Sequence, residues 1–155
     1  MFSPFSYTRA LALALGVSAL ATRPALAQNL NQVANYGYGQ PGTAGYEHLS
    51  FWTLNGRRSD VGYAAGANRE DARVSYAGPT KVGGQPGFQV RFLSGRTLYV
   101  VPSGTALRVS DASGAAPKTF VWEYEGPVNG VGTVCSVCVA DSAAALRLIR
   151  AHYLQ

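Results

Sequence analysis

The stretch from Phe88 to Tyr124 constrains the fold of this chain more than any other part of the sequence. Apolar and polar residues alternate there in four short runs. The apolar positions of these runs are Phe88, Val90, Phe92, Leu98, Val100, Leu107, Val109, Phe120, Trp122 and Tyr124. Side chains of a strand point to opposite faces in turn, so this period of two predicts a sheet with one buried face and one wetter face.

Short joints between these runs predict how the strands pair. Ser94-Gly95 and Ser103-Gly104 each separate two runs, and glycine permits the positive φ that a tight hairpin needs. Strands joined so closely run antiparallel, which makes the stretch a meander.

The region before the meander adds three more strands. Asn55-Gly56 is a strong hairpin signal between predicted strands at 47–54 and 57–63, and a further alternating run covers 72–77. The sequence therefore predicts about seven strands in a single curled antiparallel sheet, with a small β-barrel as the alternative.

A helix is expected at the C-terminal end. Asp141 or Ser142 can cap a helix through 143–153. Its apolar residues share one side at spacings of three and four: Ala145, Leu146, Ile149 and Tyr153. An apolar stripe of this kind packs on a sheet, so the predicted class is α+β.

The first 27 residues have the pattern of a secretory signal peptide. Arg9 is the only charge before an apolar run at 10–21, and Ala25-Leu26-Ala27 supplies small residues for cleavage. The run is shorter than the roughly 20 apolar residues that span a bilayer. We expect cleavage near Ala27, a secreted or periplasmic location, and no membrane span in the mature form.

Composition separates a linker from the domain that follows it. Residues 28–45 are rich in Asn, Gln, Gly and Tyr and show no regular periodicity, so the sequence predicts a flexible linker there. The domain is expected at 46–155.

Charge argues against a nucleic-acid partner. Without Arg9 and Arg23 of the predicted signal peptide, the net charge falls from +5 to +3. The remaining basic residues are scattered, with only Arg57 and Arg58 adjacent, whereas nucleic-acid binding needs a basic patch or stripe.

Cys135 and Cys138 form the sharpest motif of the chain. In an exported protein the expectation is a structural disulfide, and closing so short a loop contributes about 2 kcal/mol at most. Two alternatives stay open, a redox pair activated by a helix N-terminus and a zinc site. Zinc needs about four ligands, and only His48 and His152 could join as imidazoles. We expect neither a metal ion nor a cofactor.

A pair of carboxylates offers a weaker catalytic hypothesis. Glu123 and Glu125 are two residues apart, so on a strand they share a face at a separation of about 6–7 Å. Such a pair could act as acid and base on a sugar, or form a solvated strand face that discourages edge pairing.

Two aromatic side chains are candidates for a binding surface. Trp52 and Tyr99 fall out of phase with the inward positions of their strands, and exposed aromatics on a sheet face often hold sugars or proteins. Arg57 and Arg58 complete the expected surface. His48, next to Glu47, could act as a general base, although a lone histidine is more often a structural residue, and no nucleophile-elbow pattern surrounds Ser50.

These observations favour a non-enzymatic binding module for a protein or glycan ligand. The alternatives are an envelope thiol oxidoreductase that uses the cysteine pair and a hydrolase that uses the paired carboxylates.

Overall fold

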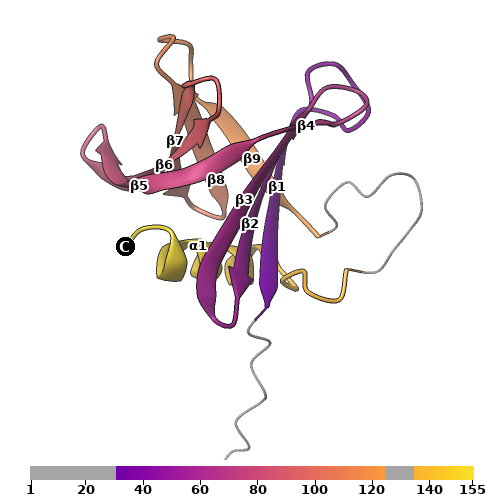
Figure 1. The fold of residues 1–155 in the computed structure, drawn as a ribbon, viewed down its shortest axis with the longest axis vertical. Coiled ribbons are helices and arrows are strands. Elements are labelled where there is room, and N and C mark those ends of the chain that lie inside the picture. The colour runs from indigo at the N-terminus through magenta and orange to yellow at the C-terminus, as the bar shows by residue number, and fades with distance from the viewer. Residues whose placement is uncertain (1–30, 125–134) are drawn as a thin grey trace, which may run out of the picture.

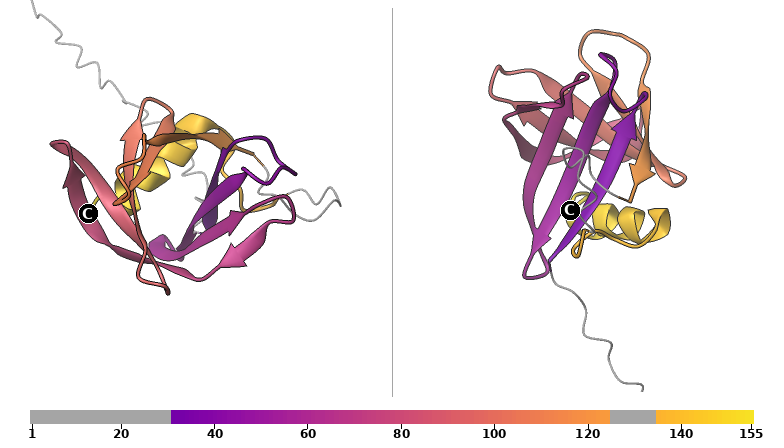
Figure 2. Two further views of the ribbon diagram at one scale, coloured as in Figure 1. Left: turned by 90° about the horizontal axis from the view of Figure 1, so that it is seen from above. Right: turned by 90° about the vertical axis from the view of Figure 1, so that its right-hand side faces the viewer.

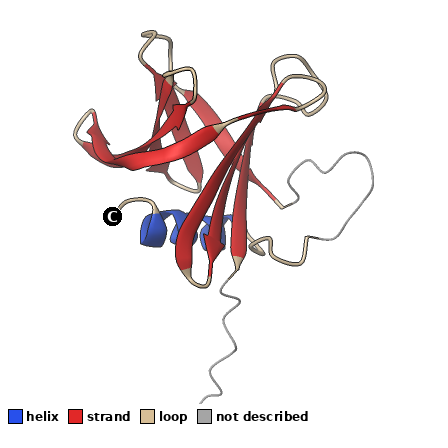
Figure 3. Cartoon of the chain, viewed as in Figure 1, coloured by secondary structure: helices blue, strands red, loops and turns tan. Residues whose placement is uncertain are grey.

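The computed structural model describes residues 31–124 and 135–155, and the predicted signal peptide lies outside them. Within these ranges the chain forms nine strands and one helix (Figure 3). The strands are β1 (Gln32–Tyr38), β2 (Glu47–Leu54), β3 (Arg57–Ala65), β4 (Glu70–Ala72), β5 (Val74–Val82), β6 (Gln85–Phe92), β7 (Thr97–Ser103), β8 (Ala106–Asp111) and β9 (Lys118–Glu123), and the helix is α1 (Ser142–His152).

The nine strands form one antiparallel sheet that curls into a half-barrel. Its strand order is β4-β3-β2-β1-β9-β8-β7-β6-β5 (Figure 1). The edge strands β4 and β5 follow one another in the chain, with only Arg73 between them. Seen from above, the sheet makes an open arc (Figure 2). The predicted class, a curled antiparallel sheet with one C-terminal helix, is confirmed.

The predicted hairpins are confirmed where the sequence placed them. The joint between β2 and β3 has positive φ at Asn55 and Gly56, of 51° and 70°. Gly95 and Gly104 have φ of 90° and 60° in the joints that precede β7 and β8. These turns set the register of the meander, in which Phe88 pairs with Val100 and Leu107 with Phe120.

The prediction of a flexible linker at 28–45 is wrong for the residues of β1. This strand lies between β2 and β9 and pairs with both. Its inward residues Ala34 and Tyr36 and its outward residues Val33 and Asn35 are all buried. Because both faces are covered, the strand lacks the alternation that marked the others.

Two more strands differ from the sequence-based expectation of about seven. β4 begins between the predicted strands at 57–63 and 72–77, where no strand was expected, and it pairs with the end of β3. β5 continues through Gly78 and Pro79, where it was expected to end, because a register shift between Tyr76 and Gly78 accommodates them. An edge strand tolerates proline and a bulge, since one side of it has no ladder to maintain.

The inward faces of the strands and the buried side of α1 share one core. Val90, Leu98 and Leu107 lie in it with Ile149 and Tyr153. Three rings form its aromatic centre, with centroids 5.2 Å apart for Phe51–Tyr153, 5.4 Å for Phe88–Tyr153 and 5.5 Å for Phe51–Phe88. Trp122 packs against this core from a partly buried position.

Helix α1 lies at the lower end of the half-barrel in the view of Figure 1. Asp141 caps its N-terminus, because the Asp141 carboxylate accepts a hydrogen bond from the main-chain amide of Ala144 at 2.6 Å. After its end, the Tyr153 hydroxyl reaches two main-chain carbonyls, those of Trp52 (2.8 Å) and Asp60 (3.1 Å). No helix of the described residues is long and apolar enough to cross a bilayer.

Candidate functional site

A cleft of about 520 Å³ lies on the outer face of β1, β2 and β3. The alternation that turns Leu49 and Phe51 into the core turns the intervening side chains outward. The lining residues are Val33, Asn35, His48, Ser50, Trp52, Gly62, Tyr63, Ala64, Asn68, Arg69, Asp71, Cys135 and Cys138. Segments distant in sequence therefore meet here, from β1 to the cysteine pair.

Buried polar side chains form the floor of the cleft. Asn35, His48 and Ser50 are only 4%, 7% and 9% exposed. Outward-facing side chains of a sheet are normally more exposed to solvent. These three are buried because they lie at the bottom of a cleft whose other lining residues include Asn68, Arg69 and the cysteine pair. The floor presents an amide, an imidazole and a hydroxyl.

The cysteine pair builds one side of the cleft. Cys135 and Cys138 form a disulfide, which confirms the expected bridge. The main chain beside it continues the sheet, because the Val33 amide donates to the Val137 carbonyl at 2.9 Å and the Val139 amide donates to the Val33 carbonyl at 3.0 Å. The Asn35 amide nitrogen also donates to Cys138 Sγ at 3.4 Å.

His48 is neutral on this floor at ordinary pH. Burial, with a smaller contribution from the nearby Arg69 charge, lowers the pKa of its imidazole to about 4. Its Nε2 atom has no hydrogen-bond partner among the described residues. A buried polar atom without a partner is uncommon in folded proteins, and the surrounding packing leaves almost no surface of this atom accessible.

Trp52 stands at the rim with 40% of its surface exposed. Its indole nitrogen donates to the Ser50 hydroxyl at 3.3 Å, which fixes the ring relative to the floor. Gly62 on the neighbouring strand leaves room for that hydroxyl, because a Cβ at this position would collide with Ser50 Oγ. The absence of a side chain at Gly62 thus leaves room for the Ser50 hydroxyl, and this hydroxyl positions the Trp52 ring, the exposed aromatic ring of the cleft.

Arg69 lies in the turn between β3 and β4 and supplies the positive charge of the cleft. Its guanidinium lies over the Tyr46 ring, 5.1 Å from the centroid. It forms no ion pair within the parts of the chain that the structure describes. The backbone φ of Arg69 is 53°, which lies in the left-handed region. Residues other than glycine and asparagine rarely adopt this conformation.

Glu123 has a structural partner beside this site. Its carboxylate accepts the Tyr46 hydroxyl hydrogen at 2.7 Å. Burial, reinforced by this carboxylate, raises the pKa of Tyr46 well above its ordinary value. Glu125, the other member of the predicted carboxylate pair, lies outside the described residues.

The remaining predicted surface residues do not gather at the cleft. Tyr99 lies on β7, separated from β2 in the sheet by β1, β9 and β8. Arg58 contacts the end of α1, because its guanidinium donates to the His152 carbonyl at 3.0 Å. The same guanidinium lies over the Tyr76 ring of β5, 3.7 Å from the ring centroid. Arg57 is exposed at the start of β3.

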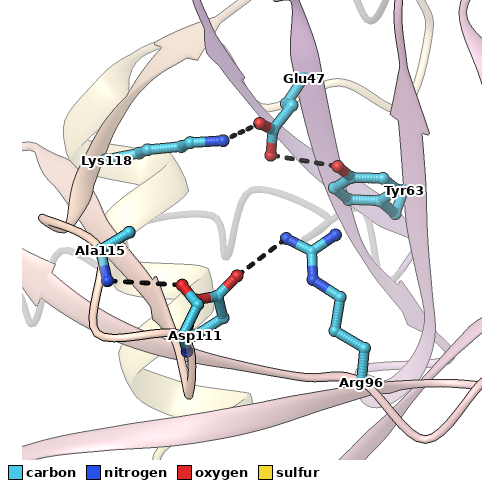
Figure 4. A network of polar contacts seen from close by, with 7 residues as sticks. Glu47, Tyr63, Arg96, Asp111, Ala115 and Lys118 are labelled. Carbon is cyan, nitrogen blue, oxygen red and sulfur yellow. Dashed lines mark hydrogen bonds and ion pairs between the residues drawn. The ribbon is translucent and has the colours of Figure 1, made fainter.

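A second polar cluster contains two ion pairs between strands that are distant in the sequence (Figure 4). Lys118 pairs with Glu47, which also accepts the Tyr63 hydroxyl hydrogen at 3.0 Å. Arg96 pairs with Asp111 at 3.2 Å. The space between them is about 30 Å³, which is room for about one water molecule, so the cluster offers much less space than the outer-face cleft.

Sequence reasoning missed two of the residues that define the cleft. Asn35 lies in the strand that was expected to be a linker, and Arg69 lies in a turn with no motif. A usable signal was present in β2, where His48, Ser50 and Trp52 are spaced two apart and so share one face.

Neither a metal cluster nor a known relative identifies the site. The described residues contain no group of three or more His, Cys, Asp or Glu side chains that could hold a metal ion. No protein-family model, curated protein or solved structure matches the chain.

Proposed function

We propose that this protein is a non-enzymatic binding module that holds a saccharide unit in the outer-face cleft. One observation carries this proposal. An exposed indole ring stands at the rim of a cleft whose floor holds three neutral polar side chains, and each of the three is more than nine-tenths buried.

The chemistry of the cleft suits a sugar ring. A saccharide has an apolar face that packs on an aromatic ring and a rim of hydroxyls that both donate and accept hydrogen bonds. Asn35 and Ser50 offer such partners, as a side-chain amide and a hydroxyl that line the cleft. The volume of about 520 Å³ falls in the range of small-molecule sites.

The arrangement of possible catalytic groups favours binding over catalysis. The Ser50 hydroxyl accepts a hydrogen bond from the Trp52 indole, and no hydrogen bond between it and His48 is present in the structure. Helix α1 begins four residues after Cys138 with Asp141 as its cap. A thiol oxidoreductase of this type has its first cysteine at the helix N-terminus, where the thiolate is stabilised, so the later start of α1 supports binding over redox chemistry.

An exported location accompanies this proposal. A disulfide persists in oxidising compartments and is rare in the cytosol of mesophiles, so the Cys135–Cys138 bridge supports it. We propose that the protein works outside the cytoplasm, where glycans are abundant.

A glycan panel tests the proposal. The purified protein is screened against neutral and acidic oligosaccharides, and binding is followed by tryptophan fluorescence and calorimetry. Trp52→Ala should abolish binding. Leu54→Ala is the matched control, since Leu54 is exposed on the same strand but does not line the cleft, and it should bind normally. Binding unaffected by Trp52→Ala, or absent for all glycans, would reject the proposal.

A further inference from the structure

We propose that the saccharide is an acidic one, and that Arg69 receives its carboxylate at the end of the cleft formed by the turn between β3 and β4. This inference rests on the proposed function and names its ligand class.

The surroundings of Arg69 leave its charge available to a ligand. Its guanidinium lines the cleft and lies over the Tyr46 ring. Glu123 of β9 is hydrogen-bonded to the Tyr46 hydroxyl. Asp71 lines the same cleft, but the described residues hold no ion pair of Arg69 with it or with another acid. A guanidinium is a planar fork of donors that matches a carboxylate through two parallel hydrogen bonds.

The backbone at Arg69 points to the same role. Its φ of 53° lies in the left-handed region, where a side chain with a Cβ is strained. Asparagine and glycine suit such a position, and both occur in this turn, as Asn68 and Gly66. An arginine that keeps this conformation at the edge of a cleft is the kind of local strain found at ligand sites.

The floor next to Arg69 is compatible with an anion. His48 is uncharged there, and the positive charge of Arg69 helps to keep it so. Asp71 is the other charged side chain that lines the cleft. A carboxylate bound to Arg69 would offset the field of the guanidinium, so the pKa of His48 would rise when an acidic sugar binds. This coupling gives a readout that does not depend on affinity.

The test compares sugars that differ only in charge. The probes are uronate tetramers derived from polygalacturonate, alginate and hyaluronan, together with the methyl esters of the same tetramers. We expect at least one acid to bind about tenfold or more tightly than its ester, as for a hydrogen-bonded charge pair. N-acetyl-glutamate serves as a carboxylate of the peptide type and should bind no better than the esters.

Two variants assign the difference to Arg69. Arg69→Asn suits the left-handed backbone but lacks the guanidinium, so acid and ester should bind equally and the melting temperature should stay the same or rise. Arg147→Asn removes an exposed arginine from α1 and should leave the preference intact. By NMR, the His48 pKa should rise with the acid and stay constant with the ester.

Each failure has a separate meaning. Equal binding of acids and esters, or a preference that survives Arg69→Asn, overturns this inference and leaves the proposed function standing. Tight binding of N-acetyl-glutamate without binding of uronates overturns it in favour of a peptide ligand. Absence of binding to every glycan rejects the proposed function itself.

Discussion

The hydroxyl of Tyr153, just after the end of α1, donates a hydrogen bond to the main-chain carbonyl of Trp52 at 2.8 Å. The Asp60 carbonyl lies 3.1 Å from the same hydroxyl. The two carbonyls converge because the register of β2 and β3 shifts between Phe51 and Thr53. A bulge leaves backbone groups without ladder partners, and here the two carbonyls share the one hydroxyl hydrogen of Tyr153. The strand that presents Trp52 to the cleft is thus held from the core side by Tyr153.

Removal of the Tyr153 hydroxyl should destabilise the protein. Tyr153→Phe keeps the buried ring but removes the one hydroxyl hydrogen that the two partly buried carbonyls share, so the free energy of unfolding should fall by about 1–2 kcal/mol in denaturant titrations. Tyr99→Phe, on the outer face of β7, should change it by less than about 0.5 kcal/mol. Equal stability of Tyr153→Phe and the wild type would show that the bulge does not depend on this bond.

Buried tyrosines should make the fold sensitive to alkali. Burial raises the pKa of Tyr63 to about 12 and the pKa of Tyr36 and Tyr153 further. A tyrosine with a raised pKa in the folded state contributes stability that is complete below the unfolded pKa of about 10 and is lost above it. Unfolding titrations should therefore show constant stability up to about pH 9 and a steep fall above about pH 10. Absorbance that reports normal ionisation of all tyrosines in the folded protein would contradict this.

His48 should make the stability of the fold sensitive to acid. Its folded pKa of about 4 is below the ordinary value, so its contribution to stability is complete above the unfolded pKa of about 6.5 and is lost as the pH falls towards 4. Between about pH 7 and pH 5, the wild type should lose about 2 kcal/mol more than His48→Asn. Parallel pH profiles for the two proteins would refute a buried neutral imidazole.

Gly62 should be intolerant of a side chain. Gly62→Ala places a methyl group against the Ser50 hydroxyl, which displaces the partner of the Trp52 indole. Stability should fall by about 1–3 kcal/mol, and glycan binding should weaken. Gly45→Ala is the control, because a Cβ there meets nothing within 4 Å. Normal glycan binding by Gly62→Ala would show that Ser50 does not position Trp52.

The disulfide should matter more to the cleft than to the fold. Replacing both Cys135 and Cys138 by serine should cost about 2 kcal/mol or less, because the closed loop is short. The sheet and α1 do not depend on the bridge, so circular dichroism should keep its native form. Glycan affinity should fall, since the segment that carries the cysteines pairs with Val33 and forms one side of the cleft. Complete unfolding of the double variant would contradict the claim that the sheet and α1 do not depend on the disulfide.

The meander and the helix were predictable because their signals are local. In β6 to β9 one face is buried and the other is wetter, so a period of two survives in the sequence, and the hairpin glycines lie between the runs. In α1 the cap and the apolar stripe lie within one short segment. Burial follows directly from such patterns.

β1 was not predictable because both of its faces are covered. Its outward residues Val33 and Asn35 lie beneath the cysteine segment and the cleft, a relation between residues about one hundred positions apart. Gly37 also hides the pattern, since the Glu123 side chain occupies the space that a Cβ would fill. The same long-range packing explains why Trp52 was identified as a binding residue while Asn35 and Arg69 were not.

The indole signal of Trp52 offers the most direct test of the binding cleft. The chain has two tryptophans, so a nitrogen–proton correlation spectrum contains two indole resonances, and Trp52→Phe identifies which one belongs to Trp52. During titration with the uronate tetramers, the Trp52 resonance should shift and saturate, while the Trp122 resonance inside the half-barrel should stay in place. A Trp52 resonance that does not move while a glycan binds would contradict the assignment of the cleft.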